Sequence, residues 1–247
     1  MEIYLDTANV EQIRHAARLG IISGVTTNPS LMAKEKGADF KATIQEICRI
    51  VQGPISAEVL SLEADSMVEE ARRLATWSPY VVIKVPLLPQ GLEVIHRLAE
   101  TYADAGHICD GCVHQEDCPT GVESARTMVE DMPIPTNATL CFSVNQGLLA
   151  AAAGATYVSP FVGRLDDIGH DGMEVVAGLV EVYRHYDIAT RVIAASLRHP
   201  RHLTEAALAG ADIATVPYDV LMKALQHPLT DIGVERFLAD WKKAMGG

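Results

Sequence analysis

A lysine within an apolar segment is the residue of this sequence best suited to covalent chemistry. Lys84 stands in the run YVVIKVP, whose other residues are typical of a strand buried on both faces. Burial disfavours the charged ammonium, so the neutral amine becomes available to attack a carbonyl carbon and form an imine. The alternative is a structural lysine that pairs with a carboxylate such as Asp6 or Glu58.

Two carboxylates in other short apolar runs could supply the proton transfers that an imine needs. Asp6 ends the run IYLD, and Glu58 lies in ISAEV. An imine requires an acid and a base to form and to hydrolyse, and two carboxylates in different surroundings can divide these roles. Each carboxylate alone is more often part of a strand-end salt bridge or a loop cap. The presence of both carboxylates together with Lys84 is what favours a catalytic role.

These three residues need elements that bring them together, and the chain offers eight short apolar or β-branched runs, each followed by a helical pattern. The runs cover 3–6, 24–28, 55–59, 80–85, 137–142, 156–161, 191–196 and 213–217. The stretches 65–77 and 172–186 between them repeat apolar residues at helical spacing. An open doubly wound sheet would have the same local pattern. Polar residues at the ends of most runs favour a closed α/β barrel, the (β/α)8 TIM barrel, whose strand ends converge on one pocket.

The same runs carry a family resemblance. LDTANV, GVTTNPSLMAKE, SAEV, IKVP, NATLCFS, SPFVGRLDD, AASLRHP and PLTDIGVERFLADW resemble the transaldolase family, especially its short-chain branch, which includes fructose-6-phosphate aldolases. The resemblance covers nearly all of the chain except about residues 103–133. It implies a barrel enzyme of the pentose phosphate pathway that needs no cofactor. Such an enzyme transfers a dihydroxyacetone unit from sedoheptulose 7-phosphate or fructose 6-phosphate to an aldose phosphate.

The resemblance also implies roles for individual residues. Lys84 is similar to the Schiff-base lysine that attacks C2 of the ketose, and Asp6 to the group that takes the C4 hydroxyl proton as the C3–C4 bond breaks. Glu58 and Thr139 resemble the pair that holds a catalytic water. The positions that match substrate-binding residues are Thr26, Asn28, Asn137, Ser159, Phe161, Arg164, Ser196 and Arg198. Among these, Arg164, Ser196 and Arg198 match the phosphate site, where two guanidinium groups and a hydroxyl suit a dianion.

Several of these residues have a purely structural alternative. Arg164 precedes Asp166 and Asp167 and could form a surface salt bridge. Ser196 could cap the turn that follows it. Asn28, which precedes a proline, is typical of a loop entering a helix, and it could cap that helix and bind substrate together.

Two positions bear on the choice between transfer and simple cleavage. In the family, transaldolases tend to carry glutamate where Glu58 stands and phenylalanine where Phe161 stands, whereas the aldolases carry glutamine and tyrosine. A tyrosine hydroxyl could position water or protonate the enamine, which a phenyl ring cannot do. The resemblance therefore favours a transaldolase over a fructose-6-phosphate aldolase. A barrel that has lost turnover and serves as a binding scaffold is a third hypothesis, and the intact catalytic positions speak against it.

Composition and charge limit the class of function. The chain has 247 residues, of which 49% are hydrophobic, as expected for a single barrel domain over 1–247. Its net charge of −12 comes without a Lys/Arg run that could follow a nucleic-acid backbone. No apolar run approaches the roughly 20 residues needed to span a bilayer. We therefore expect a soluble, cytoplasmic protein whose partners are small sugar phosphates.

The segment 103–133 departs from the family pattern and is longer than the usual link. We expect it between helix 4 and strand 5, on the face opposite the active site, because the helix after strand four is already accounted for. The residues that fit that helix are Gly91, Leu92, Ile95 and Leu98. A competing alignment starts the helix at Gly121 and would place the segment beside the pocket.

The same segment contains a candidate metal site. Cys109 and Cys112 form a C-x-x-C pair, Cys118 follows, and His107 or His114 could be a fourth ligand for zinc or an iron–sulfur cluster. Such a site would stabilise a loop that lacks its own core. The alternative is three reduced thiols or a redox-labile pair. The proposed imine chemistry needs no metal.

The C-terminal stretch 234–245 places Phe237, Leu238 and Trp241 on one face of a predicted helix. Short transaldolases form pentameric rings that stack into decamers, so the resemblance implies a homo-oligomer in which this face could pack. The helix could equally cover its own barrel.

Overall fold

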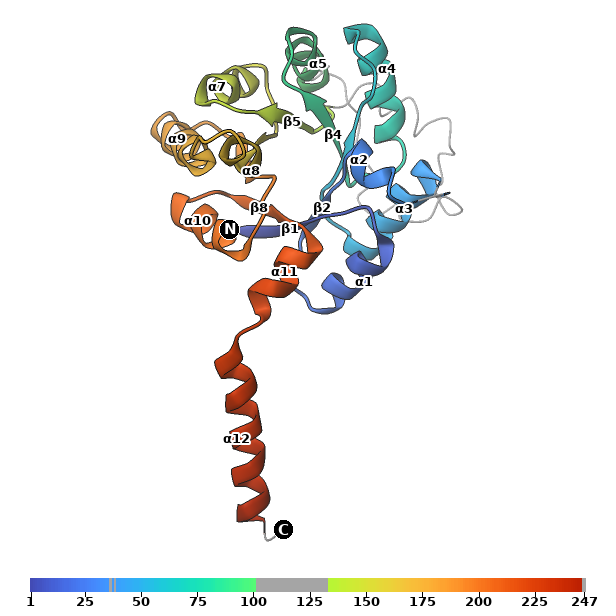
Figure 1. Cartoon of the computed structure of the whole chain (residues 1–247). Helices are drawn as coiled ribbons and strands as arrows, with labels where there is room; N and C mark the ends of the chain where they lie inside the picture. Colours follow the sequence, from blue (N-terminus) through green and yellow to red (C-terminus); the bar gives the residue numbers. More distant parts are fainter. Residues whose placement is uncertain (36, 38, 101–132, 246–247) are drawn as a thin grey trace.

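Eight parallel strands form a closed barrel in the computed structural model of this chain, which describes residues 1–35, 37, 39–100 and 133–245. Each strand pairs with the next along the chain, and β8 pairs with β1 to close the sheet (Figure 1). The strands are β1 (Glu2–Asp6), β2 (Gly24–Thr26), β3 (Ile55–Glu58), β4 (Val81–Pro86), β5 (Thr136–Cys141), β6 (Tyr157–Pro160), β7 (Arg191–Ala194) and β8 (Ile213–Val216). The predicted (β/α)8 TIM barrel is confirmed.

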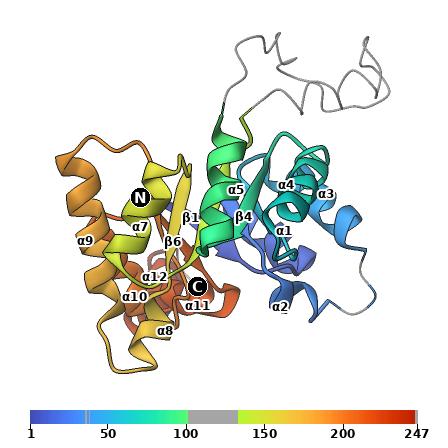
Figure 2. The same cartoon turned by 90° about the horizontal axis from the view of Figure 1, so that it is seen from above.

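Helices follow the strands along the chain, and all of them except α12 lie around the barrel, as Figures 1 and 2 show. They are α1 (Val10–Arg18), α2 (Pro29–Met32), α3 (Phe40–Val51), α4 (Ala64–Ala75), α5 (Pro89–Ala99), α7 (Val144–Ala152), α8 (Val162–Asp166), α9 (Gly172–His185), α10 (Pro200–Ala209), α11 (Tyr218–Leu225) and α12 (Pro228–Ala244). Short polar side chains begin several of them. Asn9, Asp39 and Ser143 each accept a hydrogen bond from a backbone N–H in the first turn of α1, α3 and α7, which satisfies a donor that the helix itself leaves free.

The interior of the barrel is filled by two layers that follow from the period of two along each strand. Tyr4, Val82, Tyr157, Ile193 and Ile213 form a buried apolar cluster. Two residues further along the strands, the same inward direction is taken by polar side chains: Asp6 after Tyr4, Lys84 after Val82, Ser159 after Tyr157 and Thr215 after Ile213. The apolar layer therefore closes the barrel beneath a polar layer that lies at the carboxyl ends of the strands.

The helix after β4 is α5, as the preferred alignment predicted. Gly91, Ile95 and Leu98 are buried on its inner side, and the backbone N–H of Ile134 donates to the carbonyl of Leu98 at 2.9 Å, just before β5 begins. The chain between Glu100 and Pro133 thus lies between α5 and β5. The candidate metal ligands lie outside the described residues: His107, Cys109, Cys112, His114 and Cys118.

Helix α12 projects away from the barrel, with the C-terminus at its far end (Figure 1). It begins at Pro228, six residues before the predicted stretch 234–245, and none of its residues is buried. The interpretation that this helix covers its own barrel is therefore wrong for this structure. Among the described helices, none is long and apolar enough to cross a membrane.

The close approach of α5 to β4 predicts a glycine requirement at position 91. A Cβ atom at Gly91 would lie 1.9 Å from the backbone carbonyl oxygen of Pro86, an atom that cannot move without displacing the strand that carries Lys84. We expect Gly91→Ala to lower the free energy of unfolding by about 1–3 kcal/mol in a urea titration. Gly233→Ala is the matched control, because a Cβ at Gly233 on α12 meets nothing within 4 Å. A Gly91 variant as stable as the control would contradict this account of the packing.

Candidate functional site

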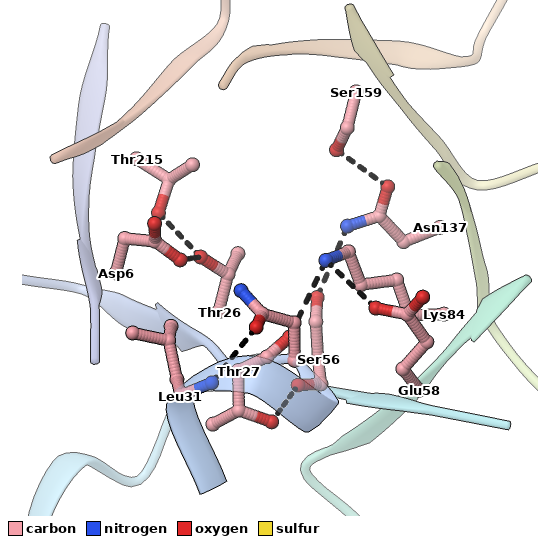
Figure 3. A network of polar contacts seen from close by, with 11 residues as sticks. Asp6, Thr26, Thr27, Leu31, Ser56, Glu58, Lys84, Asn137, Ser159 and Thr215 are labelled. Atoms are coloured by element: carbon pink, nitrogen blue, oxygen red, sulfur yellow. Dashed lines mark hydrogen bonds and ion pairs between the residues drawn. The ribbon is translucent and has the colours of Figure 1, made fainter. Parts of the chain in front are cut away.

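The residues expected to do chemistry lie on the strands, in the loops that follow them or, for Arg164, on helix α8 after β6. Eight are side chains of the strands themselves or of the loop after β2: Asp6, Thr26, Asn28, Glu58, Lys84, Asn137, Thr139 and Ser159. Four more follow β6 and β7: Phe161, Arg164, Ser196 and Arg198. Figure 3 shows the centre of this group, where polar side chains from seven different strands, β1 to β6 and β8, point toward one another.

Lys84 lies within this polar layer, with only 5% of its surface exposed. Its Nζ donates to Oε2 of Glu58 at 3.1 Å and to the backbone carbonyl of Thr27 at 3.3 Å. Lys84 and Glu58 are direct neighbours in the register of β4 and β3, so the strand pairing itself places the two groups together. The ion pair that the structural alternative anticipated is present. It also places a carboxylate where it can exchange a proton with an amine.

Asp6 is joined to Thr26 and Thr215 in a chain of hydroxyls. The hydroxyl of Thr26 donates to Oδ1 of Asp6 at 2.8 Å, and it lies 2.6 Å from the hydroxyl of Thr215. Because Thr26 has one proton and gives it to Asp6, Thr215 donates to Thr26. Burial raises the pKa of Asp6, and the positive charge of Lys84 and the hydrogen bond from Thr26 only partly oppose that rise. Asp6 is therefore a carboxylate that binds a proton more readily than an exposed aspartate.

Asn137 is held on both sides of its amide. Its Oδ1 accepts from the hydroxyl of Ser159 at 2.7 Å, and its Nδ2 donates to the hydroxyl of Ser56 at 3.1 Å. All three side chains are buried. The two hydroxyls fix which way the amide faces, so one N–H of Nδ2 and one lone pair of Oδ1 are left to meet a ligand.

A bulge in β5 sets the position of Thr139. The pairing of β5 with β6 shifts between Ala138 and Cys141, and Leu140 has a left-handed φ of 58°. Such a backbone is strained for a residue with a side chain, and bulges are frequent beside active sites. The hydroxyl of Thr139 is buried and has no hydrogen-bond partner among the described residues. A buried hydroxyl needs a partner, so this one is suited to a water or a substrate.

Phe161 connects the lysine with an arginine. The ring centroid of Phe161 lies 5.9 Å from Nζ of Lys84 and 5.0 Å from Cζ of Arg164. The ring is held edge-on by Phe142 at 5.8 Å between centroids. The contact of Arg164 that the structure describes is thus a stacking contact on Phe161, rather than the salt bridge with Asp166 or Asp167 that was the alternative.

The loop after β7 brings Ser196 and Arg198 next to the start of α8. The carbonyl of Ser196 accepts from the N–H of Gly163 at 3.1 Å, and Nη2 of Arg198 lies 2.8 Å from Oδ2 of Asp167. Ser196 has a left-handed φ of 60°, and the residue that precedes the first turn of α10 is His199. His199, and not Ser196, is therefore the N-cap residue of α10, and the alternative in which Ser196 caps the turn that follows it stays a prediction. Asn28 does cap α2, through a 2.9 Å hydrogen bond from the N–H of Leu31.

Sequence reasoning missed three residues of the polar layer. Ser56 orients Asn137, the carbonyl of Thr27 accepts from Lys84, and Thr215 donates to the Thr26 hydroxyl. Ser56 and Thr215 interrupt the apolar runs ISAEV and IATVP in the same way as Thr26 interrupts GVTTN. The signal used for Thr26, a hydroxyl near the end of an apolar run, would have found Thr215 but not Ser56, which lies near the start of its run.

Comparison with known proteins identifies the family. The model of the transaldolase/fructose-6-phosphate aldolase family matches residues 3–246. The chain belongs to this family. It is 57% identical over 242 residues to a probable transaldolase of Roseiflexus castenholzii, which covers 98% of the chain and 97% of that protein. It is 55% identical over 242 residues to a probable transaldolase of Heliobacterium modesticaldum, with 98% of each chain covered.

A solved structure gives an independent view of the fold. A candidate fructose-1,6-biphosphate aldolase from Coccidioides immitis superposes with a TM-score of 0.52 at 13% sequence identity, covering 93% of this chain and 81% of that one. At this identity the likeness concerns the barrel alone. Family membership therefore rests on the sequence relatives. The geometry described above shows how the residues that match the family are arranged in this chain.

The raised pKa of Asp6 predicts a stability cost at neutral pH. The folded protein binds this proton more tightly than the unfolded chain, whose aspartate titrates near 3.8, so stability falls as the pH rises through the folded-state pKa. We expect Asp6→Asn to have a higher melting temperature than the unchanged protein at pH 7, with the gain shrinking as the pH falls toward 3.8. Asp65→Asn, at an exposed position, is the control and should change little. An Asp6→Asn variant less stable than the unchanged protein at pH 7 would contradict the direction of the shift.

Proposed function

We propose that this chain is a transaldolase that moves a dihydroxyacetone unit from sedoheptulose 7-phosphate or fructose 6-phosphate to an aldose phosphate. The observation that carries the proposal is the buried amine of Lys84, 3.1 Å from the carboxylate of Glu58, in the polar layer that also holds Asp6. An amine in this setting can lose its proton to the neighbouring carboxylate and attack a carbonyl carbon. Membership of the transaldolase/fructose-6-phosphate aldolase family supports the same chemistry.

The first step is formation of the imine. Nζ of Lys84 attacks C2 of the ketose, the carbonyl oxygen takes up a proton, and the carbinolamine then loses water to give a protonated Schiff base. Glu58 and Thr139 are the groups we assign to this water, because one is a carboxylate in contact with Nζ and the other a buried hydroxyl without a protein partner among the described residues. The same water and the same groups serve hydrolysis of the imine in the reverse direction.

The second step breaks the C3–C4 bond. Asp6 takes the proton of the C4 hydroxyl, the C4 oxygen forms the aldehyde of the leaving product, and the bond electrons move to C3 to give an enamine on Lys84. The enamine carbon then attacks the aldehyde of the acceptor, and Asp6 returns its proton to the new alkoxide. A carboxylate whose pKa is raised by burial suits this exchange, because it accepts the proton more readily than an exposed aspartate would.

The remaining residues bind the substrate in this proposal. Asn28, Asn137, Thr26 and Ser159 face the hydroxyls of the dihydroxyacetone unit. The phosphate is held by Arg164, Ser196 and Arg198, which lie on α8 and in the loop after β7. Arg198 already pairs with Asp167 at 2.8 Å, and both side chains are about half exposed, so a dianionic phosphate can compete for the guanidinium.

Transfer is favoured over simple cleavage by the surroundings of the enamine. Glu58 and Phe161 are the residues that transaldolases tend to carry at these positions, and the Phe161 ring lies 5.9 Å from Nζ of Lys84. An apolar ring supplies no proton to the enamine carbon, so the intermediate survives until an acceptor aldehyde arrives. A fructose-6-phosphate aldolase is the alternative activity, because the family description names both enzymes. A non-catalytic scaffold is the remote alternative.

We also propose that the enzyme acts in the cytoplasm, in the pentose phosphate pathway, because phosphorylated sugars are charged and do not cross a bilayer unaided. The reaction as written uses side chains alone. The structural zinc or iron–sulfur site that the sequence suggested for Cys109, Cys112 and Cys118 stays a prediction outside the described residues.

The proposed activity predicts acceptor-dependent release of glyceraldehyde 3-phosphate from fructose 6-phosphate. We expect release in the presence of erythrose 4-phosphate, little release without it, and a loss of at least about a thousandfold in Lys84→Ala, which lacks the nucleophile. Lys41→Ala, which removes a surface lysine of α3, is the control and should keep full activity. Release that does not depend on the acceptor would show an aldolase, and absence of any Lys84-dependent release would overturn the proposed function.

We further propose that α12 packs on a neighbouring subunit of a ring-shaped homo-oligomer, a pentamer or decamer. The large apolar side chains of this helix and of its C-cap residue Met245 are exposed: Leu229, Ile232, Val234, Phe237, Leu238, Trp241 and Met245. Phe237 and Trp241 are 73% and 64% exposed. An apolar surface of this kind on one subunit marks a contact with another chain. The partner we infer is a second copy of this chain, since the helix belongs to the matched family region.

The oligomer proposal predicts that charge on this face separates the subunits. We expect Phe237→Asp combined with Trp241→Asp to shift the mass in solution from an oligomer to a single subunit of 26.7 kDa, measured by light scattering during size-exclusion chromatography. Arg236→Asp with Lys243→Asp, on the same helix, is the matched control and should leave the oligomer intact. If the protein with both Phe237→Asp and Trp241→Asp kept the mass of the unchanged oligomer, the proposed role of α12 would be contradicted.

A further inference from the structure

A buried histidine that the proposed reaction does not use contacts the loop after β7, which carries Ser196 and Arg198 of the proposed phosphate site. His202, on α10, is only 6% exposed. Its Nδ1 accepts a hydrogen bond from the backbone N–H of Arg198 at 3.2 Å, and its Nε2 lies 3.1 Å from Oδ2 of Asp166 on α8. One imidazole ring therefore connects the loop that carries Arg198 with the helix that carries Arg164.

These two contacts define the protonation state of the ring. A backbone N–H can only donate, so Nδ1 of His202 must offer a lone pair. The single ring proton then lies on Nε2 and is donated to the carboxylate of Asp166. The other oxygen of Asp166 accepts from the backbone N–H of Gly172 at 3.0 Å, so this carboxylate is also fixed by the first residue of α9. The contacts form one continuous chain from the Arg198 backbone to the start of α9.

The loop that this chain holds is strained and closely packed. Ser196 has a left-handed φ of 60°, a conformation that persists only when neighbouring contacts stabilise it. A Cβ atom at Gly163 would lie 2.3 Å from the carbonyl oxygen of Ser196 and 2.6 Å from Cγ of Arg198, so the loop and the Arg198 side chain run directly over the α8 backbone. Small shifts of the Arg198 backbone would therefore move the guanidinium and the Ser196 hydroxyl together.

We propose that His202 is a positioning residue for the phosphate site: through the Arg198 backbone and Asp166 it fixes Arg198 and Ser196 relative to Arg164, and so sets the affinity for phosphorylated substrates. The role of the site rests on the proposed function. His202 does not touch the substrate in this arrangement. Its effect appears in phosphate affinity and in KM, whereas the imine chemistry at Lys84 is independent of it.

The same geometry makes the phosphate site sensitive to acid. A second proton on His202 would go to Nδ1, where it would face the N–H of Arg198, and two donors repel. Asp166 and Glu205 favour this protonation, whereas the neighbouring His199 ring, 3.7 Å away between centroids, and the charge of Arg198 oppose it. Burial is the largest effect and lowers the pKa of His202, so the ring is neutral and an acceptor at pH 7.

Two substitutions at this position separate the contacts. His202→Leu removes both hydrogen bonds, and we expect it to weaken binding of inorganic phosphate by about tenfold in a calorimetric titration at pH 7. The KM for fructose 6-phosphate should rise by a similar factor with kcat within about twofold. His202→Asn keeps an acceptor oxygen near the place of Nδ1, so it should retain phosphate affinity within about threefold. It should also lose the additional weakening of phosphate binding that we expect of the unchanged protein as the pH falls through the lowered pKa of His202.

Borohydride trapping of dihydroxyacetone on Lys84 measures imine formation with a substrate that has no phosphate. The trapped amount should be equal in the unchanged protein, His202→Leu and His202→Asn. His185→Asn, at an exposed position of α9, is the matched control and should leave phosphate binding unchanged. Phosphate affinity unchanged in His202→Leu, or no phosphate binding by the unchanged protein, would overturn the proposal. A protein that binds phosphate in this His202-dependent way but releases no glyceraldehyde 3-phosphate would overturn the proposed function and leave the positioning role standing.

Discussion

The cost of burying the Lys84 ammonium is the constraint on which the rest of the site depends. A charge removed from water is stable only with a partner of opposite charge and with its hydrogen bonds satisfied. Glu58 supplies the charge at 3.1 Å, and the carbonyl of Thr27 supplies a further acceptor. These partners are themselves polar and partly or fully buried, so they need partners in turn. A closed barrel can meet this demand, because polar side chains from seven of its strands meet in the same layer.

The apolar layer beneath explains how the barrel tolerates so many polar side chains. Tyr4, Val82 and Ile213 fill the interior one strand repeat below Asp6, Lys84 and Thr215. The lower layer and the helix–sheet core stabilise the fold, while the upper layer holds a carboxylate whose pKa is raised by burial and two strained residues, Leu140 and Ser196. The other two described non-glycine residues with a left-handed backbone, Gln52 and Asp187, precede β3 and β7, so backbone strain occurs at both ends of the barrel.

How much the sequence could predict depended on the kind of residue. Charged residues in apolar runs are rare, so Lys84 and Asp6 stood out. The short apolar and β-branched runs made the strands predictable within two residues at each end. Ser56 was missed because a small hydroxyl in a strand is ordinary. The left-handed Leu140 carries no local signal, since its backbone is set by the shifted pairing of β5 with β6. The direction of α12 could not be predicted either, because an apolar helix face looks the same whether it covers its own barrel or another chain.

Phe161 joins the two halves of the site. The proposed imine and proton-transfer groups lie on β1 to β5, whereas the proposed phosphate groups lie on α8 and in the loop after β7. The Phe161 ring lies between them, 5.9 Å from Nζ of Lys84 and 5.0 Å from Cζ of Arg164. Its backbone N–H is bonded to the Cys141 carbonyl of β5 at 3.0 Å, so the ring moves with the barrel and not with a free loop. The ring therefore sets the distance between the proposed phosphate site and Lys84, so a substrate bound by its phosphate has C2 within reach of the amine.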